Sequence, residues 1–169
     1  MSGRPFAHCL AVAALALAFG SAGQSNDQEF VKEAVQGNIA ELRLGELAAQ
    51  RAENENVRKF GETLRVEHHA GLQRATAVAK SLKIEPPTEP TTEARGTYEG
   101  LAQLSGGQFD AAFVSHMVVA HEAEIAKYSR NANSDHDGVA ALVAEAMPKL
   151  KAHLAAAQAL QRGAPHAQH

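Results

Sequence analysis

Residues 56–82 read NVRKFGETLRVEHHAGLQRATAVAKSL, and this stretch decides the fold. Its apolar side chains recur every three or four residues, which is the spacing of one face of an α-helix. His68 falls inside that apolar face instead of among the charged residues opposite it. The residues that share the face with His68 are Val57, Leu64, Leu72, Ala75 and Leu82. The segment is therefore expected to be a long amphipathic helix that turns an imidazole toward the protein interior.

Three further segments of helical period each place a chelating side chain in an apolar face in the same way. These side chains are Glu41, His121 and His153. Burying a polar group without a partner costs roughly 2–7 kcal/mol, and a charge costs more. The four groups, His68 included, are therefore expected to satisfy one another across the core or to share a metal ion.

Turn signals separate the four long helices. The first helix is expected to begin at Asn26 or Asp27, either of which can cap it. Polar turns at 52–56 and 131–135 should each join two antiparallel helices. Residues 84–92, IEPPTEPTT, hold three prolines within five positions, which exclude a helix and indicate an extended connection.

A short extra helix is expected at about 93–104, between the second and third long helices. The third long helix should cover about 108–130, and the fourth should end near Gln161 with Pro148 on its outward side. Two hairpins joined by a Pro-rich connection predict an all-α, antiparallel four-helix bundle over residues 24–163.

Distances along the helices predict which polar groups lie level with one another. Glu41, His68 and His121 are each at a similar number of residues from a turn, so they should lie at a similar depth. His153 is further from its turn and should lie nearer the depth of Met117. His153 therefore needs a helical stagger, or a second site, to join the other three.

Further polar residues can extend the cluster. Glu124 lies one turn from His121 on the same side, where it can add a ligand or hold the second imidazole nitrogen. Glu67 lies at the edge of its apolar face, while His69 and His116 are expected to point outward. Asp110 faces inward but lies three turns deeper, so a bond to a loop amide explains it better than ligation.

The first 23 residues are typical of a secretory signal peptide. Arg4 precedes an apolar run from Leu10 to Phe19, and residues 20–23 are small enough for cleavage. The run is shorter than the roughly 20 residues of a membrane span. Cleavage would remove the only cysteine, Cys9, and with it thiolate, disulfide and iron–sulfur chemistry. The mature protein is expected to be periplasmic or secreted, with outer-membrane association open and no transmembrane segment.

Composition and motifs exclude several other functions. The net charge is −3 and basic residues alternate with acidic ones, so a nucleic-acid footprint is not expected. The chain has neither a nucleophile elbow nor a glycine-rich phosphate loop, and enzymatic activity is not favoured. Residues 164–169 are expected to form a disordered tail in which His166 and His169 are solvated.

Three stretches carry a resemblance to a known family: FVKEAVQGNIAELRLGELAAQRAENENVRKFGETLRVEHH, GGQFDAAFVSHMVVAHEAEIAKY and MPKLKAHL. They resemble an exported bacterial family of unknown function whose members are often labelled putative outer membrane proteins and are grouped with ferritin-like four-helix bundles. The resemblance covers nearly the whole mature chain and implies the fold and export, but no reaction. It extends to Glu41, Glu67-His68, Phe109-Asp110, His121, Pro148 and His153.

Two departures limit what the resemblance implies. The family usually has aspartate before His68, where this chain has Glu67. Di-iron bundles carry Glu-x-x-His pairs, whereas Arg65 and Leu150 stand three residues before His68 and His153. The di-iron set is therefore incomplete, and ferroxidase or oxygenase activity is not expected.

Two functions remain open. In the first, the protein binds or buffers a transition metal (Zn, Cu, Fe or Mn) through Glu41, His68, His121 and His153, with Glu124, Glu67 and Asp110 as supporting groups. In the second, it is a metal-free envelope protein whose polar core fixes helix register and whose surface binds a protein partner.

Overall fold

The computed structural model describes residues 21–163, and these are α-helical without a strand. The all-α class is therefore confirmed over the described residues. The signal peptide predicted at the N-terminus lies almost entirely outside them, as does the predicted tail at 164–169. None of the described helices holds a stretch long and apolar enough to span a membrane. The helices are α1 (Ser21–Arg51), α2 (Glu55–Ser81), α3 (Thr92–Ala102), α4 (Gly106–Arg130) and α5 (Asp137–Gly163).

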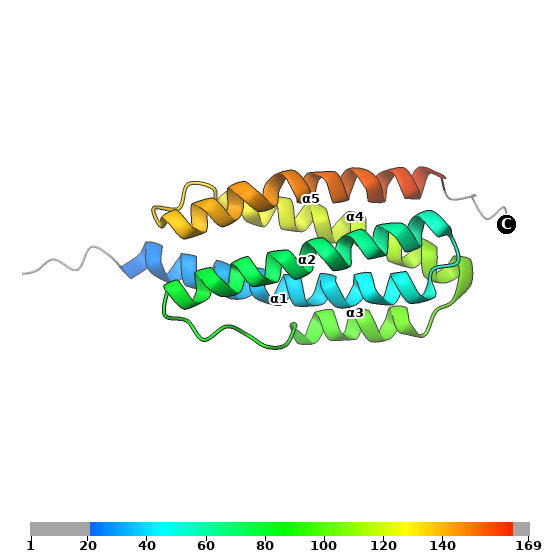
Figure 1. The fold of residues 1–169 in the computed structure, drawn as a ribbon, viewed down its shortest axis with the longest axis horizontal. Coiled ribbons are helices and arrows are strands. Elements are labelled where there is room, and N and C mark those ends of the chain that lie inside the picture. The colour runs from blue at the N-terminus through cyan, green and yellow to red at the C-terminus, as the bar shows by residue number, and fades with distance from the viewer. Residues whose placement is uncertain (1–20, 164–169) are drawn as a thin grey trace, which may run out of the picture.

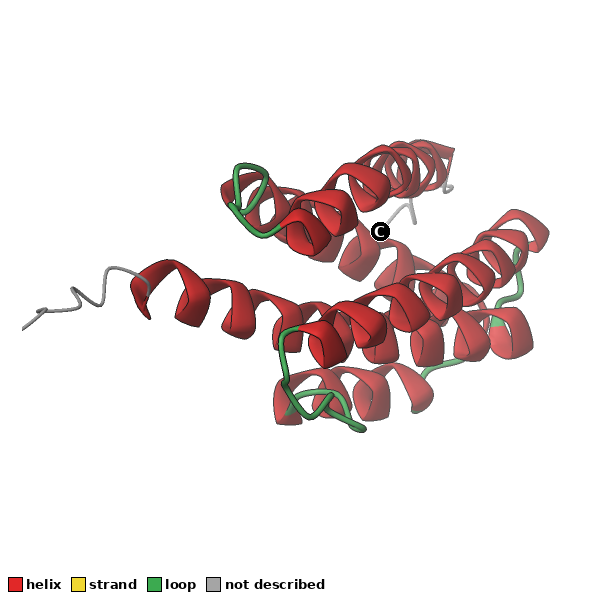
Figure 2. Ribbon diagram, turned by 60° about the vertical axis from the view of Figure 1, so that its left-hand side comes forward, coloured by secondary structure: helices red, strands yellow, loops and turns green. Residues whose placement is uncertain are grey.

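The long helices form two pairs that pack against each other. Helix α1 packs along α2, and α4 packs along α5 (Figure 1). The two pairs meet where α2 contacts α5, with a further contact between α1 and α4 (Figure 2). The short helix α3 lies on the outer side of α1, away from α5. The predicted short helix after the Pro-rich connection is thus present, at Thr92–Ala102.

The turn between α1 and α2 is held by two acceptor side chains. Asn54 caps α2, because its side-chain oxygen accepts a hydrogen bond from the amide of Asn56 at 2.8 Å. Asp110 of α4 accepts from the amides of Glu53 and Asn54 at 3.2 and 2.7 Å. The interpretation of Asp110 as a partner of a loop amide is therefore confirmed.

The start of α1 differs from the prediction. The helix begins at Ser21, so Asn26 and Asp27 lie within it and do not cap it. The Asp27 carboxylate instead accepts a hydrogen bond from the Ser134 hydroxyl at 2.8 Å, beyond the end of α4. Asp27 is a suitable capping residue, but it bonds to Ser134 in the turn between α4 and α5 instead of to the start of its own helix.

Glycines allow α1 and α2 to approach each other backbone to backbone. A Cβ added to Gly45 would lie 2.7 Å from the backbone nitrogen of Arg65 and the backbone oxygen of Gly61. A Cβ added to Gly61 would lie 2.8 Å from the nitrogen of Ala49. Any larger residue at these two positions would push the helices apart.

The core consists of two hydrophobic clusters with a polar layer between them. In each long helix, one buried polar residue (Glu41, His68, His121 or His153) lies between the segment that supplies one cluster and the segment that supplies the other. The first cluster includes Phe30, Val35, Ala79, Tyr128, Val139 and Leu142. The second cluster includes Leu47, Phe60, Leu64, Phe109, Phe113 and Met117. The buried polar residues are Asn38, Glu41, His68, His121 and His153.

Pro148 lies inside α5 and is exposed, on the side away from both clusters. It therefore removes one helical hydrogen bond without taking a core position, as the sequence predicts.

Candidate metal centre

Three histidines meet in the polar layer. His68 of α2, His121 of α4 and His153 of α5 are only 5%, 0% and 4% exposed. Their ring centroids are 5.9 Å apart for His68–His121, 5.3 Å for His68–His153 and 5.2 Å for His121–His153. One ring nitrogen from each histidine lies within 4.8 Å of those of the other two. Three imidazoles from three helices are therefore close enough to offer nitrogen ligands to one ion.

Hydrogen bonds on the outer nitrogens fix two of these rings. Nδ1 of His121 lies 2.9 Å from the carbonyl oxygen of Met117, which can only accept, so Nδ1 carries the proton. The Asn38 amide nitrogen donates to the carbonyl of Ala34 at 2.8 Å, so the amide oxygen is left to accept from Nδ1 of His68 at 3.2 Å. In their neutral forms both rings therefore keep a lone pair on Nε2.

The third ring, His153, stands between an imidazole and a carboxylate. Its Nδ1 is 3.2 Å from Nε2 of His121, and its Nε2 is 3.1 Å from a carboxylate oxygen of Glu67. A neutral imidazole has one proton, but both of these neighbours are acceptors when Glu67 is ionised. If the proton is on Nε2, it binds Glu67, and the lone pair on Nδ1 then faces the lone pair of His121.

Burial keeps these imidazoles neutral. Loss of hydration lowers the pKa of His68 well below its ordinary value and lowers the pKa of His121 to about 4. Burial also lowers the pKa of His153, although the Glu67 carboxylate opposes that effect. Neutral imidazole is the form that binds a metal ion, so the rings need not lose a ring proton near neutral pH.

Two carboxyl groups lie in the same polar layer. They are Glu41 of α1, which is 5% exposed, and Glu124 of α4. Each has one carboxylate oxygen that is buried without a hydrogen-bond partner. Burial raises the pKa of Glu41 well above its ordinary value, and the nearby Glu124 adds to the increase. Burial raises the pKa of Glu124 to about 7, against the opposing effect of Lys127. Both groups therefore tend to hold a proton at a pH where exposed glutamates are ionised.

The structure groups the predicted site residues differently from the depth argument. Within residues 21–163, His68, His121 and His153 form the one set whose ligand atoms lie mutually within 4.8 Å, and Glu41 is not in it. His153 belongs to the set because its Nδ1 lies 3.2 Å from Nε2 of His121, whose ring also contacts the carbonyl of Met117 one turn earlier in α4. Depth counted along the backbone missed this contact, because side chains on a helix lean toward its N-terminus and so carry a ring away from the level of its own Cα.

The supporting residues can be placed as well. Glu67 orients His153, while Asp110 lies away from the histidines at the turn between α1 and α2. Of the two histidines expected to point outward, His69 is exposed and His116 is half-buried. Burial lowers its pKa. Asn38 was missed, although it stands one helical turn before Glu41 in the same apolar face, which is a usable signal.

Comparison with known proteins places the chain in a family. No curated protein matches it. The crystal structure of a DUF305 fragment from Deinococcus radiodurans is similar, with a TM-score of 0.72 and 17% sequence identity, over 81% of this chain and 96% of that chain. A likeness at this identity shows the fold alone. The pattern of DUF4142, described as a domain of unknown function, matches residues 13–160. The chain therefore belongs to the DUF4142 family, as a helical domain with a buried histidine cluster.

Proposed function

We propose that this protein binds one transition metal ion through His68, His121 and His153. The observation that carries the proposal is the hydrogen bonding of the three outer nitrogens, to the Asn38 amide oxygen, the Met117 carbonyl and the Glu67 carboxylate. With protons on those nitrogens, three lone pairs turn toward one another in the core. The lone pairs repel one another, and a cation bound between them would attract all three. Metal-binding histidines almost always donate a hydrogen bond from their other ring nitrogen, as these do.

The spacing of the rings supports the proposal. In a tetrahedral zinc site with Zn–N bonds of 2.0–2.1 Å, two ligand nitrogens lie about 3.3–3.4 Å apart. Nε2 of His121 and Nδ1 of His153 are 3.2 Å apart. His68 completes the set from the opposite helix pair, with an Nε2 that is buried and has no hydrogen-bond partner.

The ligand types favour some metals over others. Three imidazoles without a thiolate suit Zn²⁺, Cu²⁺ or Fe²⁺, and they suit Mn²⁺ less well because it prefers oxygen ligands. Glu41 is left out of the proposed ligand set, in contrast to the sequence-based hypothesis. Together with Glu124 it would act on the ion through charge, because a nearby dication favours the ionised form of a carboxyl group.

Elemental analysis tests the proposal directly. The protein would be purified without an affinity tag and with His166 and His169 replaced by alanine, so that these two histidines do not contribute to binding. We expect one zinc, copper or iron ion per chain. His121→Ala should abolish binding, while the matched change of the exposed His69→Ala should leave it intact. A chain that takes up none of these metals at neutral pH contradicts the proposal.

One observation favours a second candidate function, a metal-free core that fixes helix register. A continuous chain of contacts, at 2.9, 3.2 and 3.1 Å, runs from Met117 through His121 and His153 to Glu67. A single proton added to His153 would make each of these contacts a hydrogen bond with one donor and one acceptor. Buried polar networks of this kind can specify one arrangement of helices. In that case the protein would act as an envelope protein whose surface binds a partner, and the elemental analysis separates the two functions.

We further propose that the protein is exported and that it acts in the periplasm. The charged start, apolar run and small residues of the first 23 positions support this. N-terminal sequencing of the periplasmic fraction should find a chain that begins between Gly20 and Gln24. An intact Met1 in that fraction contradicts export by cleavage.

We also propose that α1, α2, α4 and α5 form a ferritin-like four-helix bundle, with α3 as an addition to it. The packing of α1 along α2, of α4 along α5 and of α2 against α5 supports this assignment. An experimental structure in which the four helices do not enclose a common core would overturn it.

A further inference from the structure

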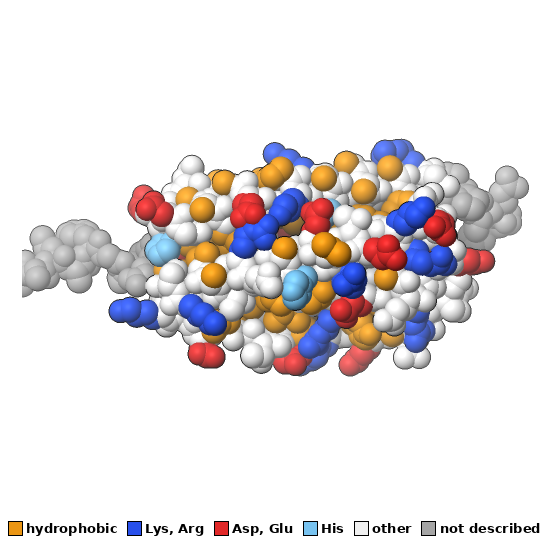
Figure 3. Space-filling view, in the orientation of Figure 1, with side chains coloured by type: hydrophobic (Ala, Val, Ile, Leu, Met, Phe, Trp, Pro, Cys, Tyr) orange, Lys and Arg blue, Asp and Glu red, His pale blue; other side chains and the backbone are white. Residues whose placement is uncertain are grey.

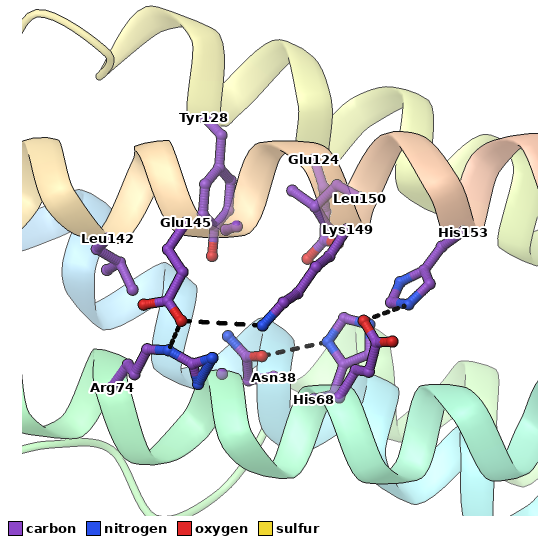
Figure 4. A pocket seen from close by; sticks show the side chains of 13 residues that line it. Asn38, His68, Arg74, Glu124, Tyr128, Leu142, Glu145, Lys149, Leu150 and His153 are labelled. Atoms are coloured by element: carbon purple, nitrogen blue, oxygen red, sulfur yellow. Dashed lines mark hydrogen bonds and ion pairs between the residues drawn. The ribbon is translucent and has the colours of Figure 1, made fainter.

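A small cavity lies beside the three histidines, between α2 and α5. It has a volume of about 40 Å³. His68 and His153 form part of its wall, together with the polar side chains of Asn38, Glu124 and Tyr128 (Figure 4). The cavity therefore reaches two of the three proposed ligands from one side.

Charged side chains surround the outer part of this cavity. Glu145 of α5 forms ion pairs with Arg74 of α2 at 2.5 Å and with Lys149 at 3.9 Å. All three residues line the cavity, and the face on which α2 and α5 lie carries Lys, Arg, Asp and Glu side chains close together (Figure 3). The cavity thus runs from a charged, partly exposed mouth inward to the imidazoles.

A site with three histidine ligands leaves one tetrahedral position for another ligand. Metal sites with three protein ligands ordinarily take a water molecule or a small exogenous ligand there. His121 is 0% exposed and does not line the cavity, whereas His68 and His153 do. This cavity borders two of the three rings, whereas a second cavity, beside Phe60 and Leu160, borders His153 alone, so the fourth position should face the first.

The size and lining of the cavity suit a water molecule. The cavity has a volume of about 40 Å³. Measured in the same way, about 10–15 Å³ is enough to hold one water molecule. A buried water molecule also needs two to four polar partners. Glu124 offers such a partner, because one of its carboxylate oxygens is buried without a hydrogen bond. Its other oxygen faces α1, where a Cβ on Gly37 would lie 3.0 Å away, so the carboxyl group is confined between α1 and the cavity.

We propose that the cavity holds the fourth ligand of the metal, a water molecule that donates a hydrogen bond to Glu124, and that a small anion such as azide can replace this water. This inference rests on the proposed metal site. It assigns Glu124 as a positioning residue for the exogenous ligand and excludes organic ligands of larger size from the metal.

Cobalt-loaded protein and azide provide the test, because the visible spectrum of Co²⁺ reports its ligands. Azide should change the spectrum of the full-length wild-type protein. Azide has no proton to donate to Glu124, so Glu124→Gln, whose amide can donate, should lower the dissociation constant for azide by about tenfold. Ala146 also lines the cavity, and Ala146→Val should raise that constant by about tenfold by filling the space.

A matched control and the metal content make each outcome decisive. Ala144→Val, on the exposed side of the same helix, should bind azide as the wild type does. If one Co²⁺ binds per chain and azide leaves its spectrum unchanged, the cavity is not the fourth position, and the metal site itself stands. An azide response that Glu124→Gln does not alter contradicts the role of Glu124. Failure of the protein to bind Co²⁺ overturns the metal site and this inference together.

Discussion

The two interfaces of α2 differ in kind, and the difference explains where the polar site lies. Toward α1, the helix packs backbone to backbone, through Gly45 and Gly61. Toward α5, it leaves a cavity and meets its neighbour through an ion pair and the contact of Glu67 with His153. The close interface leaves no room for a ligand. The looser one brings together side chains from two helix pairs, and of the two interfaces it is the one beside the histidines that can hold a ligand.

The largest effect is expected from a change at the close interface. Gly61→Ala would place a Cβ 2.8 Å from the backbone nitrogen of Ala49, and neither backbone can move without separating the helices. We expect it to lower the free energy of unfolding by about 3 kcal/mol, measured by urea denaturation. Gly96→Ala is the control, because its Cβ would meet nothing within 4 Å and alanine favours a helix. Equal stability of the two variants would show that the close contact is not essential.

The next effect concerns metal affinity at the looser interface. Glu67 accepts from His153 and thereby fixes the ring that joins the two helix pairs. Glu67→Ala should weaken zinc binding by roughly 10–100-fold in a competition titration with a chromogenic chelator. Glu62→Ala, at an exposed position of the same helix, should leave the affinity unchanged. An unchanged affinity in both variants would remove Glu67 from the site.

The stability of the metal-free protein should depend on pH through two buried groups, His121 and Glu124, in opposite directions. The pKa of His121 is about 4 when folded, below its ordinary value of 6.5, so the unfolded chain binds the proton first as pH falls. Stability is then lost between pH 6.5 and 4, by up to about 1.4 kcal/mol per pH unit. Glu124 acts in the opposite direction, because its folded pKa of about 7 lies above 4.5. Its contribution is present at low pH and is lost as pH rises through 7.

Urea denaturation at pH 7 and pH 5 separates the two contributions. His121→Phe should lose less stability than the wild type between these values, because the group that resists protonation is gone. Glu124→Gln should lose more, because the carboxyl group that gains stability on acidification is gone. The exposed His69→Phe serves as the reference. Identical pH dependence in all four proteins would mean that these groups titrate alike in the folded and unfolded states.

The smallest effect is expected from the ion pair between Arg74 and Glu145. It crosses the looser interface, but the two side chains are 32% and 50% exposed. Glu145→Gln should therefore reduce the free energy of unfolding by only about 0.5 kcal/mol, and less at high salt. A loss of several kcal/mol in thermal or urea denaturation would mean that the looser interface depends on charge and not on its buried contacts.

Much of the fold could be predicted from the sequence because its signals are local. Helical periodicity, the prolines at 86–90 and the polar turns depend on neighbouring residues, and they correctly indicate five helices in order. The helix that begins at Ser21 is the exception, since Asp27 finds its partner across the protein. A local capping pattern cannot show which of two available partners a carboxylate will take.

The site was predictable only in part. Periodicity identified all three histidines as inward-facing, because that depends on the helix to which each belongs. Which groups meet depends on how far each side chain reaches from its helix, and it is His153, not Glu41, that joins His68 and His121. The partner atoms of the outer nitrogens include a backbone carbonyl, that of Met117, which no side-chain pattern can reveal.

The contact of Asp110 with the turn between α1 and α2 has a consequence for the order in which the chain assembles. It joins positions 57 and 56 residues apart, whereas α1 and α2 are connected by only a short turn. Closing a long loop costs more entropy than closing a short one, so contacts between near neighbours should form earlier. The α1–α2 hairpin is therefore expected to form first, and its two free turn amides then receive the start of α4. The Asp110 side chain thus makes the packing of α4 depend on the earlier formation of the α1–α2 hairpin.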